Sequence, residues 1–98
     1  MNKFMVTYSD SGKKPDASTE ELILKHVDYI KSLAKKGTLS LCGVFKDNSG
    51  AVLIFNAASY KEVESILLMD PLVKEKYYQF TITEFIEANE ANNFLLDV

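Results

Sequence analysis

An amphipathic segment that carries the only histidine of the chain constrains the fold more than any other stretch. It begins near Leu22 and runs to Gly37. At 100° per residue, one arc of this helix contains Leu22, Ile23, His26, Val27, Tyr29, Ile30, Leu33 and Ala34. The rest of its surface carries Glu20, Glu21, Lys25, Asp28, Lys31, Lys35 and Lys36. His26 is therefore predicted to face the interior, where it either bonds a buried partner or borders a pocket.

Residues at both ends of this segment mark the limits of the helix. Ser18, with Glu21 three residues later, forms the pattern of a capping box and predicts the start of the helix. Gly37 is typical of the left-handed residue that follows a last helical turn, so we expect the helix to stop there. Residues 9–16 contain glycine and proline among polar side chains and are expected to form a loop.

The remaining segments predict four strands and a second helix. Alternating side chains indicate the strands, Ser59 can cap the helix, and Asp70 followed by proline suits the start of a further helical turn. The expected strands are residues 3–8, 38–46, 51–55 and 77–86, and the expected second helix is residues 59–68. Gly43, inside the second strand, predicts a bulge or a close approach to the backbone.

The element order, β-α-β-β-α-β, indicates a ferredoxin-like α+β sandwich, in which two helices cover one face of a four-stranded antiparallel sheet. Residues 51–55 are apolar on both sides of their strand, so the second face of the sheet also needs a cover. An identical sheet can provide it, and we therefore expect a homodimer through the sheet face. The alternative is a modest exposed apolar patch.

Length and charge narrow the class of protein. The 98 residues predict one domain (1–98), with a core at about residues 3–86 and a tail at 87–98. A net charge of −3 without a basic stripe argues against nucleic acid as a partner. The sequence shows neither an apolar run of ~20 residues nor a signal-peptide pattern, so we expect no membrane partner and a cytoplasmic location. The apolar residues 94–96 are expected to dock on their own domain or on the partner subunit.

Few residues carry patterns that point to chemistry. The sequence lacks a glycine-rich phosphate loop and a metal-ligand spacing, so neither a metal nor a cofactor is expected, and its one cysteine, Cys42, excludes an internal disulfide. His26 suits a general acid-base, because the usual pKa of histidine, about 6.5, lies near physiological pH. The alternative is a core imidazole bonded to a carbonyl. Asp70 can cap its helical turn and still bond an imidazole nitrogen, and Asp10 of the first loop is a further candidate.

Four pieces of the chain occur in an order typical of a known family. They are the strand ending in Tyr8-Ser-Asp10, the helix in which His26 precedes residues 27–33, Gly37 leading to Leu39-Ser-Leu-Cys-Gly43, and Met69-Asp-Pro-Leu-Val73 with its strand through Tyr78. Together they resemble the YciI (YCII-related) family of the dimeric α+β barrel superfamily, over roughly residues 3–86. The resemblance implies a face-to-face dimer with a cleft beside the first helix.

The resemblance also implies a catalytic His-Asp dyad, with His26 as the general base and Asp70 as its partner. Some relatives are lyases or dehydrohalogenases that act on ring compounds, so we expect a cofactor-independent lyase or hydrolase for a small organic molecule. Tyr8, Asp10 and Gly43 are expected to contact this substrate. Where many relatives have arginine three residues before the histidine, this chain has Ile23, which removes an obvious anion anchor.

A second difference from the family concerns the second strand, where this chain has Gly43-Val44 in place of Gly-Pro. Fold alone does not establish a reaction. The alternative function is therefore a non-catalytic module on the same fold, which binds a small ligand or serves as a dimeric accessory protein. Whether His26 borders an open cavity or is sealed in packing discriminates between the two.

Overall fold

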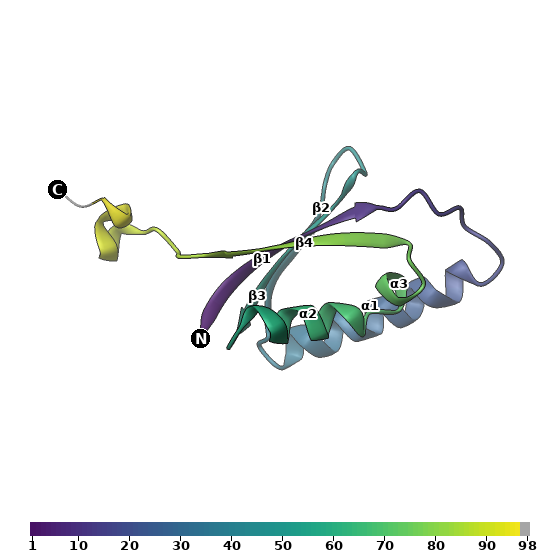
Figure 1. The fold of residues 1–98 in the computed structure, drawn as a ribbon, viewed down its shortest axis with the longest axis horizontal. Helices are drawn as coiled ribbons and strands as arrows, with labels where there is room; N and C mark the ends of the chain where they lie inside the picture. Colours follow the sequence, from purple (N-terminus) through teal and green to yellow (C-terminus); the bar gives the residue numbers. More distant parts are fainter. Residues whose placement is uncertain (97–98) are drawn as a thin grey trace.

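A four-stranded antiparallel sheet forms one layer of the protein, and helices form the other (Figure 1). The computed structural model describes residues 1–96. In chain order its elements are β1 (Asn2–Asp10), α1 (Thr19–Lys35), β2 (Leu39–Val44), β3 (Gly50–Ala57), α2 (Tyr60–Leu68), α3 (Pro71–Lys74), β4 (Tyr78–Phe85) and the 3-10 helix η1 (Glu90–Leu95). The strand order β2-β3-β1-β4 is that of the predicted ferredoxin-like α+β fold.

The helix α1 ends as predicted but begins differently. Gly37 has a φ of +78°, and the N–H of Thr38 donates to the carbonyl of Leu33 at 3.1 Å, which closes the last turn. Ser18 precedes the first helical residue, but its side chain accepts no hydrogen bond from the helix. The predicted capping box is wrong, because the Ser18 hydroxyl donates to the carboxylate of Asp16 at 2.6 Å. The hydroxyl and the backbone N–H of Ser18 both donate to the Asp16 carboxylate, and these two hydrogen bonds hold the pKa of Asp16 below its ordinary value.

Polar caps start the two helices that follow, as the sequence predicts. At α2, the Ser59 hydroxyl oxygen accepts from the N–H of Glu62 at 3.2 Å. At α3, the Asp70 carboxylate accepts from the N–H of Leu72 at 2.9 Å, and Pro71 occupies the first helical position. Proline is tolerated there because the first N–H groups of a helix have no intrahelical partner. Among residues 1–96, no helix has the length and apolar character needed to cross a membrane.

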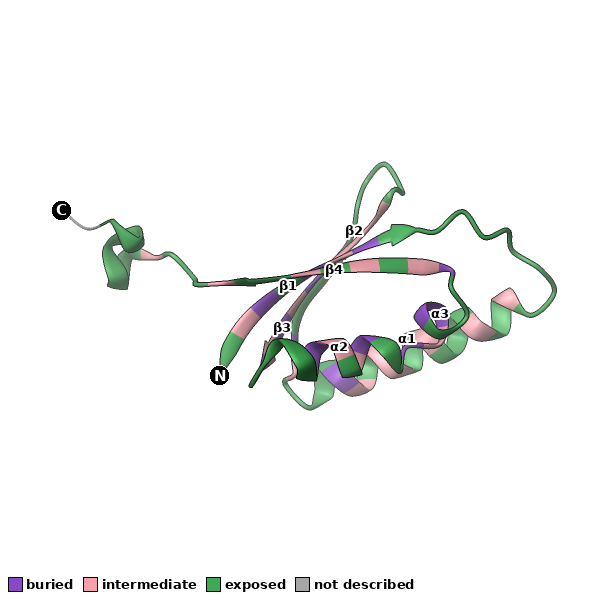
Figure 2. Cartoon of the chain, in the orientation of Figure 1, coloured by how far each residue is buried: buried purple, intermediate pink, exposed green. Residues whose placement is uncertain are grey.

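The core lies between the helices and the sheet face that they cover (Figures 1 and 2). Alternate residues of β1 and β3 point into it, as the period of a strand requires. Its buried side chains are Phe4, Val6, Tyr8, Leu33, Leu39, Leu53, Phe55, Ala57, Val63, Leu67 and Val73. Full burial of a large apolar side chain contributes ~1.5–3 kcal/mol, so this layer holds the helices firmly on the sheet.

The strand β2 contains a bulge, but at a different residue from the one predicted. The step from Leu39 to Leu41 lies opposite a single step of β3, so Ser40 is the extra residue. Gly43 lies in regular pairing with Val52, so the first alternative predicted for this glycine, a bulge, is wrong. The second, a close approach to the backbone, is wrong within the described chain as well, because a Cβ at this position would lie at an ordinary 3.8 Å from the side chain of Val52. Because side chains alternate along a strand, the extra residue moves every later side chain of β2 to the opposite face.

The outer face of the sheet, which faces away from the helices, has no cover within the described chain. Met5 of β1 is 38% exposed on this face, and Leu41 of β2 is 55% exposed. Beyond β4, the chain runs away from the sandwich into η1 (Figure 1). Phe94 is 58% exposed there, so docking of the apolar tail residues on their own domain is wrong, whereas docking on a partner subunit stays a prediction.

Candidate active site

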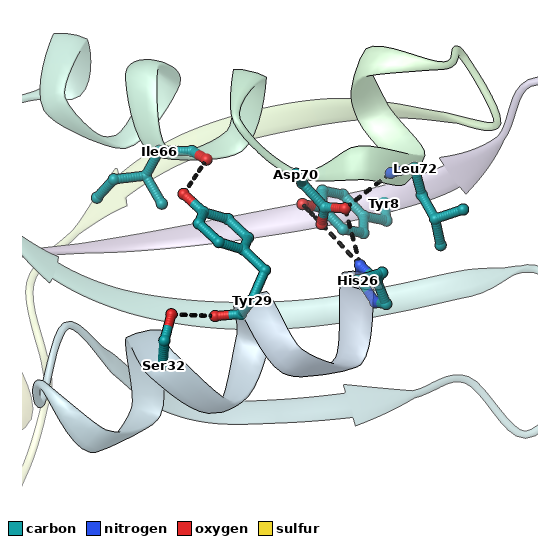
Figure 3. Close-up of polar contacts among 7 residues, drawn as sticks. All are labelled: Tyr8, His26, Tyr29, Ser32, Ile66, Asp70 and Leu72. Atoms are coloured by element: carbon teal, nitrogen blue, oxygen red, sulfur yellow. Dashed lines mark hydrogen bonds and ion pairs between the residues drawn. The ribbon is translucent and has the colours of Figure 1, made fainter. Parts of the chain in front are cut away.

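A buried carboxylate between α2 and α3 organises the site (Figure 3). Asp70 is completely buried, and its position as the cap of α3 directs Oδ1 toward the N–H of Leu72. Its Oδ2 accepts from the hydroxyl of Tyr8 at 3.0 Å. Burial of a carboxylate is costly unless hydrogen bonds replace its water. Within residues 1–96, no buried side-chain nitrogen or oxygen lacks a partner, so this cost is met by the surrounding donors.

His26 reaches this carboxylate from the middle of α1, across 44 residues of sequence. Its Nδ1 lies 2.8 Å from both carboxylate oxygens of Asp70. An ionised carboxylate only accepts hydrogen bonds, so Nδ1 carries the hydrogen of the neutral ring and Nε2 keeps its lone pair. The side chain of His26 is 19% exposed, which places the ring between the core and solvent. The predicted contact of the two side chains is present, and their catalytic role stays a prediction.

Two stacked tyrosines flank the pair. The rings of Tyr8 and Tyr78 lie with their centroids 5.2 Å apart and their planes 25° apart, and Tyr78 meets the ring of His26 edge-on at 6.2 Å. Burial, and next the nearby charge of Asp70, raise the pKa of both phenols, so both stay protonated at neutral pH. Because its hydroxyl donates to Asp70, Tyr8 is placed to position the carboxylate.

A second polar contact holds α1 against α2 (Figure 3). The Tyr29 hydroxyl donates to the carbonyl of Ile66 at 2.7 Å, and within α1 the Ser32 hydroxyl donates to the carbonyl of Tyr29 at 2.6 Å. Together with the contact between His26 and Asp70, this fastens α1 at two points to the segment formed by α2 and α3. The histidine is therefore restrained by its own contact with Asp70 and by a second contact three residues further along its helix.

His26 borders a cavity of about 430 Å³ that is lined by α1 and by residues of all four strands. The size falls within the ~300–1,000 Å³ that is usual for small-molecule sites. Most of its walls are apolar, and they include Val27, Ile30, Ala34, Leu39, Val44 and Leu53. The geometry thus combines a cavity of mostly apolar lining with a histidine whose Nδ1 is already held, which is an arrangement suited to proton transfer.

Comparison with known families agrees with this architecture. The family model described as the YCII-related domain matches residues 2–86. The chain belongs to this family. The matched range contains both His26 and Asp70, and the tail from residue 87 lies outside it.

Two solved structures share the fold of this YCII-related domain. Muconolactone isomerase superposes with a TM-score of 0.77 at 14% sequence identity, over 90% of this chain and 92% of that chain. The 5-chloro-2-hydroxyhydroquinone dehydrochlorinase of Burkholderia phenoliruptrix AC1100, in complex with 2,5-dihydroxybenzoquinone, superposes with a TM-score of 0.62 at 20% identity, over 93% and 99%. At these identities the likeness establishes the fold, which is of the dimeric α+β barrel type. None of the curated proteins compared with the chain matches it.

The YCII-related domain does not bring two of the predicted substrate contacts to the cavity of His26. Asp10, at the end of β1, accepts from the N–H of Gly12 at 2.7 Å and borders a separate, smaller hollow. Gly43 pairs with Val52 beyond the bulge, and it is not among the residues that line the cavity. Tyr8 lines it as expected, but with its hydroxyl turned to Asp70.

Three residues that line the cavity were missed by sequence reasoning: Lys31, Cys42 and Tyr78. Lys31 was assigned to the charged side of α1, although its helical neighbours Val27 and Ala34 belong to the apolar arc, and that spacing was the available signal. Cys42 lies opposite a buried residue of β3 because of the bulge, and partial burial raises the pKa of its thiol. Tyr78 depends on the register of β4 with β1, which the sequence does not display.

Proposed function

We propose that this protein is a small enzyme that uses His26 as a general acid-base on a ring compound, with Asp70 as the orienting partner. The observation that carries the proposal is the Nδ1 contact of 2.8 Å at the edge of an apolar cavity. Asp70 keeps the hydrogen on Nδ1, so the lone pair of Nε2 is available to a bound molecule. In addition, the two solved structures of the same fold are, by name, an isomerase and a dehydrochlorinase of ring compounds.

The proposed step is abstraction of a proton from an activated carbon, or from water in a hydrolase. Nε2 takes the proton, and the adjacent Asp70 carboxylate stabilises the imidazolium that forms. The electron pair left on carbon then either shifts the position of a double bond as the proton is returned, or expels a leaving group. Tyr8 holds Asp70 in place through its hydrogen bond, so the carboxylate does not need to reorient during the reaction.

A homodimer through the outer face of the sheet belongs to this proposal. A second copy would cover the exposed apolar side chains of this face, including Met5 and Leu41. Sedimentation velocity at micromolar concentration tests it, and the expected species has twice the 11.0 kDa mass of the chain. A single species with the mass of one chain at all concentrations would contradict the dimer.

Proton abstraction can be tested directly by nuclear magnetic resonance in D₂O. Muconolactone and 5-chloro-2-hydroxyhydroquinone are suitable probes, because the neighbours of the same fold are named for them. We expect exchange of a ring proton, or turnover, that falls about 10²–10⁴-fold in His26→Ala. The matched control is Lys25→Ala, an exposed position on the same helix that does not line the cavity and is expected to keep the wild-type rate. Equal rates in His26→Ala and wild type would contradict the proposal and favour the binding module.

A further inference from the structure

Three polar side-chain atoms at the cavity already have partners within the protein. Nδ1 of His26 and the hydroxyl of Tyr8 bond Asp70, and the hydroxyl of Ser40 donates to a carbonyl of β3 at 3.2 Å. Asp70 itself is buried behind the two rings and is not part of the wall. Within residues 1–96, no aspartate or glutamate lines this cavity, so this part of the chain contributes no carboxylate to its surface.

Lys31 is the only lysine or arginine of the described residues that lines the cavity. Among residues 1–96, the structure gives its ammonium group neither an ion pair nor a hydrogen bond, whereas Lys25 on the same helix pairs with Glu21 at 3.5 Å. A cation at the edge of an apolar and carboxylate-free cavity creates a positive potential inside it, because the low-dielectric walls concentrate the field. The cavity therefore favours an anion over a neutral molecule of the same shape.

The spacing along α1 separates this cation from the proposed acid-base. Lys31 follows His26 by five positions, and at 1.5 Å per residue the two positions lie about 7.5 Å apart along the helix axis. That is close to the length of a six-membered ring with one substituent. A molecule of this size can place a ring atom near the histidine while its anionic substituent reaches the lysine.

We propose that Lys31 binds the anionic group of the substrate, so that the site takes a ring compound with a single carboxylate or phenolate. This inference rests on the proposed function and names its substrate class. In this proposal Lys31 serves as the anion anchor that the sequence lacks at position 23. Ile23 itself borders a different hollow, together with Asp10. Lys31 thus lies on the opposite side of His26 along α1, and the substrate extends toward the C-terminal end of that helix.

Benzoate and its neutral analogue benzamide test this assignment without any turnover. Binding is measured by chemical-shift titration for wild type, Lys31→Gln, Lys31→Arg and, as a matched control, Lys35→Gln, which lies one turn further and does not line the cavity. We expect wild type to prefer benzoate, and Lys31→Gln to lose about twofold to fivefold in benzoate affinity with benzamide unchanged. This is the size typical of an ion pair made by an exposed lysine such as Lys31. Arginine should retain the preference, and added salt should reduce it.

Two outcomes would overturn the assignment. One is a wild-type protein that binds benzoate no better than benzamide, and the other is a Lys31→Gln variant that keeps the full preference. The same titration in His26→Ala separates this inference from the proposed function. If the charge preference survives there while proton exchange is absent in every variant, Lys31 marks a binding site and only the catalytic proposal fails. Circular dichroism checks that each variant is folded.

Discussion

The two faces of the sheet use the same strands for different purposes. On the face covered by the helices, Phe4 and Phe55 are completely buried, and Tyr8 carries the contact to Asp70. On the outer face, Met5 follows Phe4 directly in the chain but is 38% exposed. One face is therefore completed by the chain itself and holds the candidate site. The other is apolar, has no cover among residues 1–96, and is suited to a second molecule.

The largest expected effect, on the free energy of unfolding, comes from truncating a buried side chain of β3, and it is compared with a truncation on the outer face of the same strand. Phe55→Ala removes a fully buried ring and should lower the free energy of unfolding by about 3–5 kcal/mol. Its neighbour Ile54 points to the outer face, so Ile54→Ala should cost only about 1 kcal/mol. Urea denaturation of both variants measures the difference. Equal costs would mean that the outer face is as well packed as the inner one.

Removal of the buried carboxylate should have the next largest effect. Asp70→Ala leaves the N–H of Leu72 and the hydroxyl of Tyr8 without their acceptor, and an unpaired buried donor costs ~1–3 kcal/mol. The control is Ser59→Ala, which removes an exposed helix cap and should cost about 1 kcal/mol or less. Thermal and urea unfolding give both values. A smaller loss in Asp70→Ala than in Ser59→Ala would show that the site contributes little to the stability of the covered face.

A charge on the outer face should weaken the proposed dimer and leave each chain folded. Met5→Glu places a carboxylate near the centre of that face, and its desolvation should raise the dissociation constant at least about tenfold, or 1.4 kcal/mol. Leu68→Glu, an exposed apolar position at the end of α2, is the matched control and should not change it. Sedimentation equilibrium provides both constants. Equal dissociation constants in the two variants would place the interface elsewhere.

The tail should have the smallest effect on a single chain. Phe94 and its neighbours are exposed, so deletion of residues 88–98 should change the unfolding free energy of the monomer by no more than about 0.5 kcal/mol. If these residues dock on the partner subunit, the same deletion should weaken the dimer measurably. A truncated protein with unchanged melting and an unchanged dimer affinity would argue against docking.

The fold could be predicted because it follows from local patterns. Period-two alternation identified β1 and β4, a 3.6-residue period identified α1, and Gly37 and Asp70 marked helix ends by well-understood backbone chemistry. The meeting of His26 and Asp70 was predictable as well, because two helices on one sheet face are neighbours. The resemblance to a known family pointed to the same pair.

The features that could not be predicted depend on the pairing register of the strands and on which of several possible partners a polar side chain bonds. The bulge at Ser40 has no distinctive residue, whereas Gly43 carried a false signal for one. Ser18 had the right type for a cap, but its hydroxyl bonds Asp16, which is closer in the loop. Likewise, Asp10 was expected to contact the substrate, but its carboxylate accepts from the N–H of Gly12 within its own turn. The sequence does not reveal this local hydrogen bond.

The bulge in β2 decides which side chains of that strand lie on the inner face of the sheet. Cys42 and Val44 lie opposite inward-facing residues of β3 only because Ser40 adds one position to the strand. Regular pairing of the same residues, without the bulge, would instead place Leu41 and Gly43 opposite those residues of β3, although no side chain had changed its identity. A shift of the pairing register in this edge strand would therefore be enough to change which of its side chains contact a bound molecule, while His26 and Asp70, which lie outside β2, keep their contact.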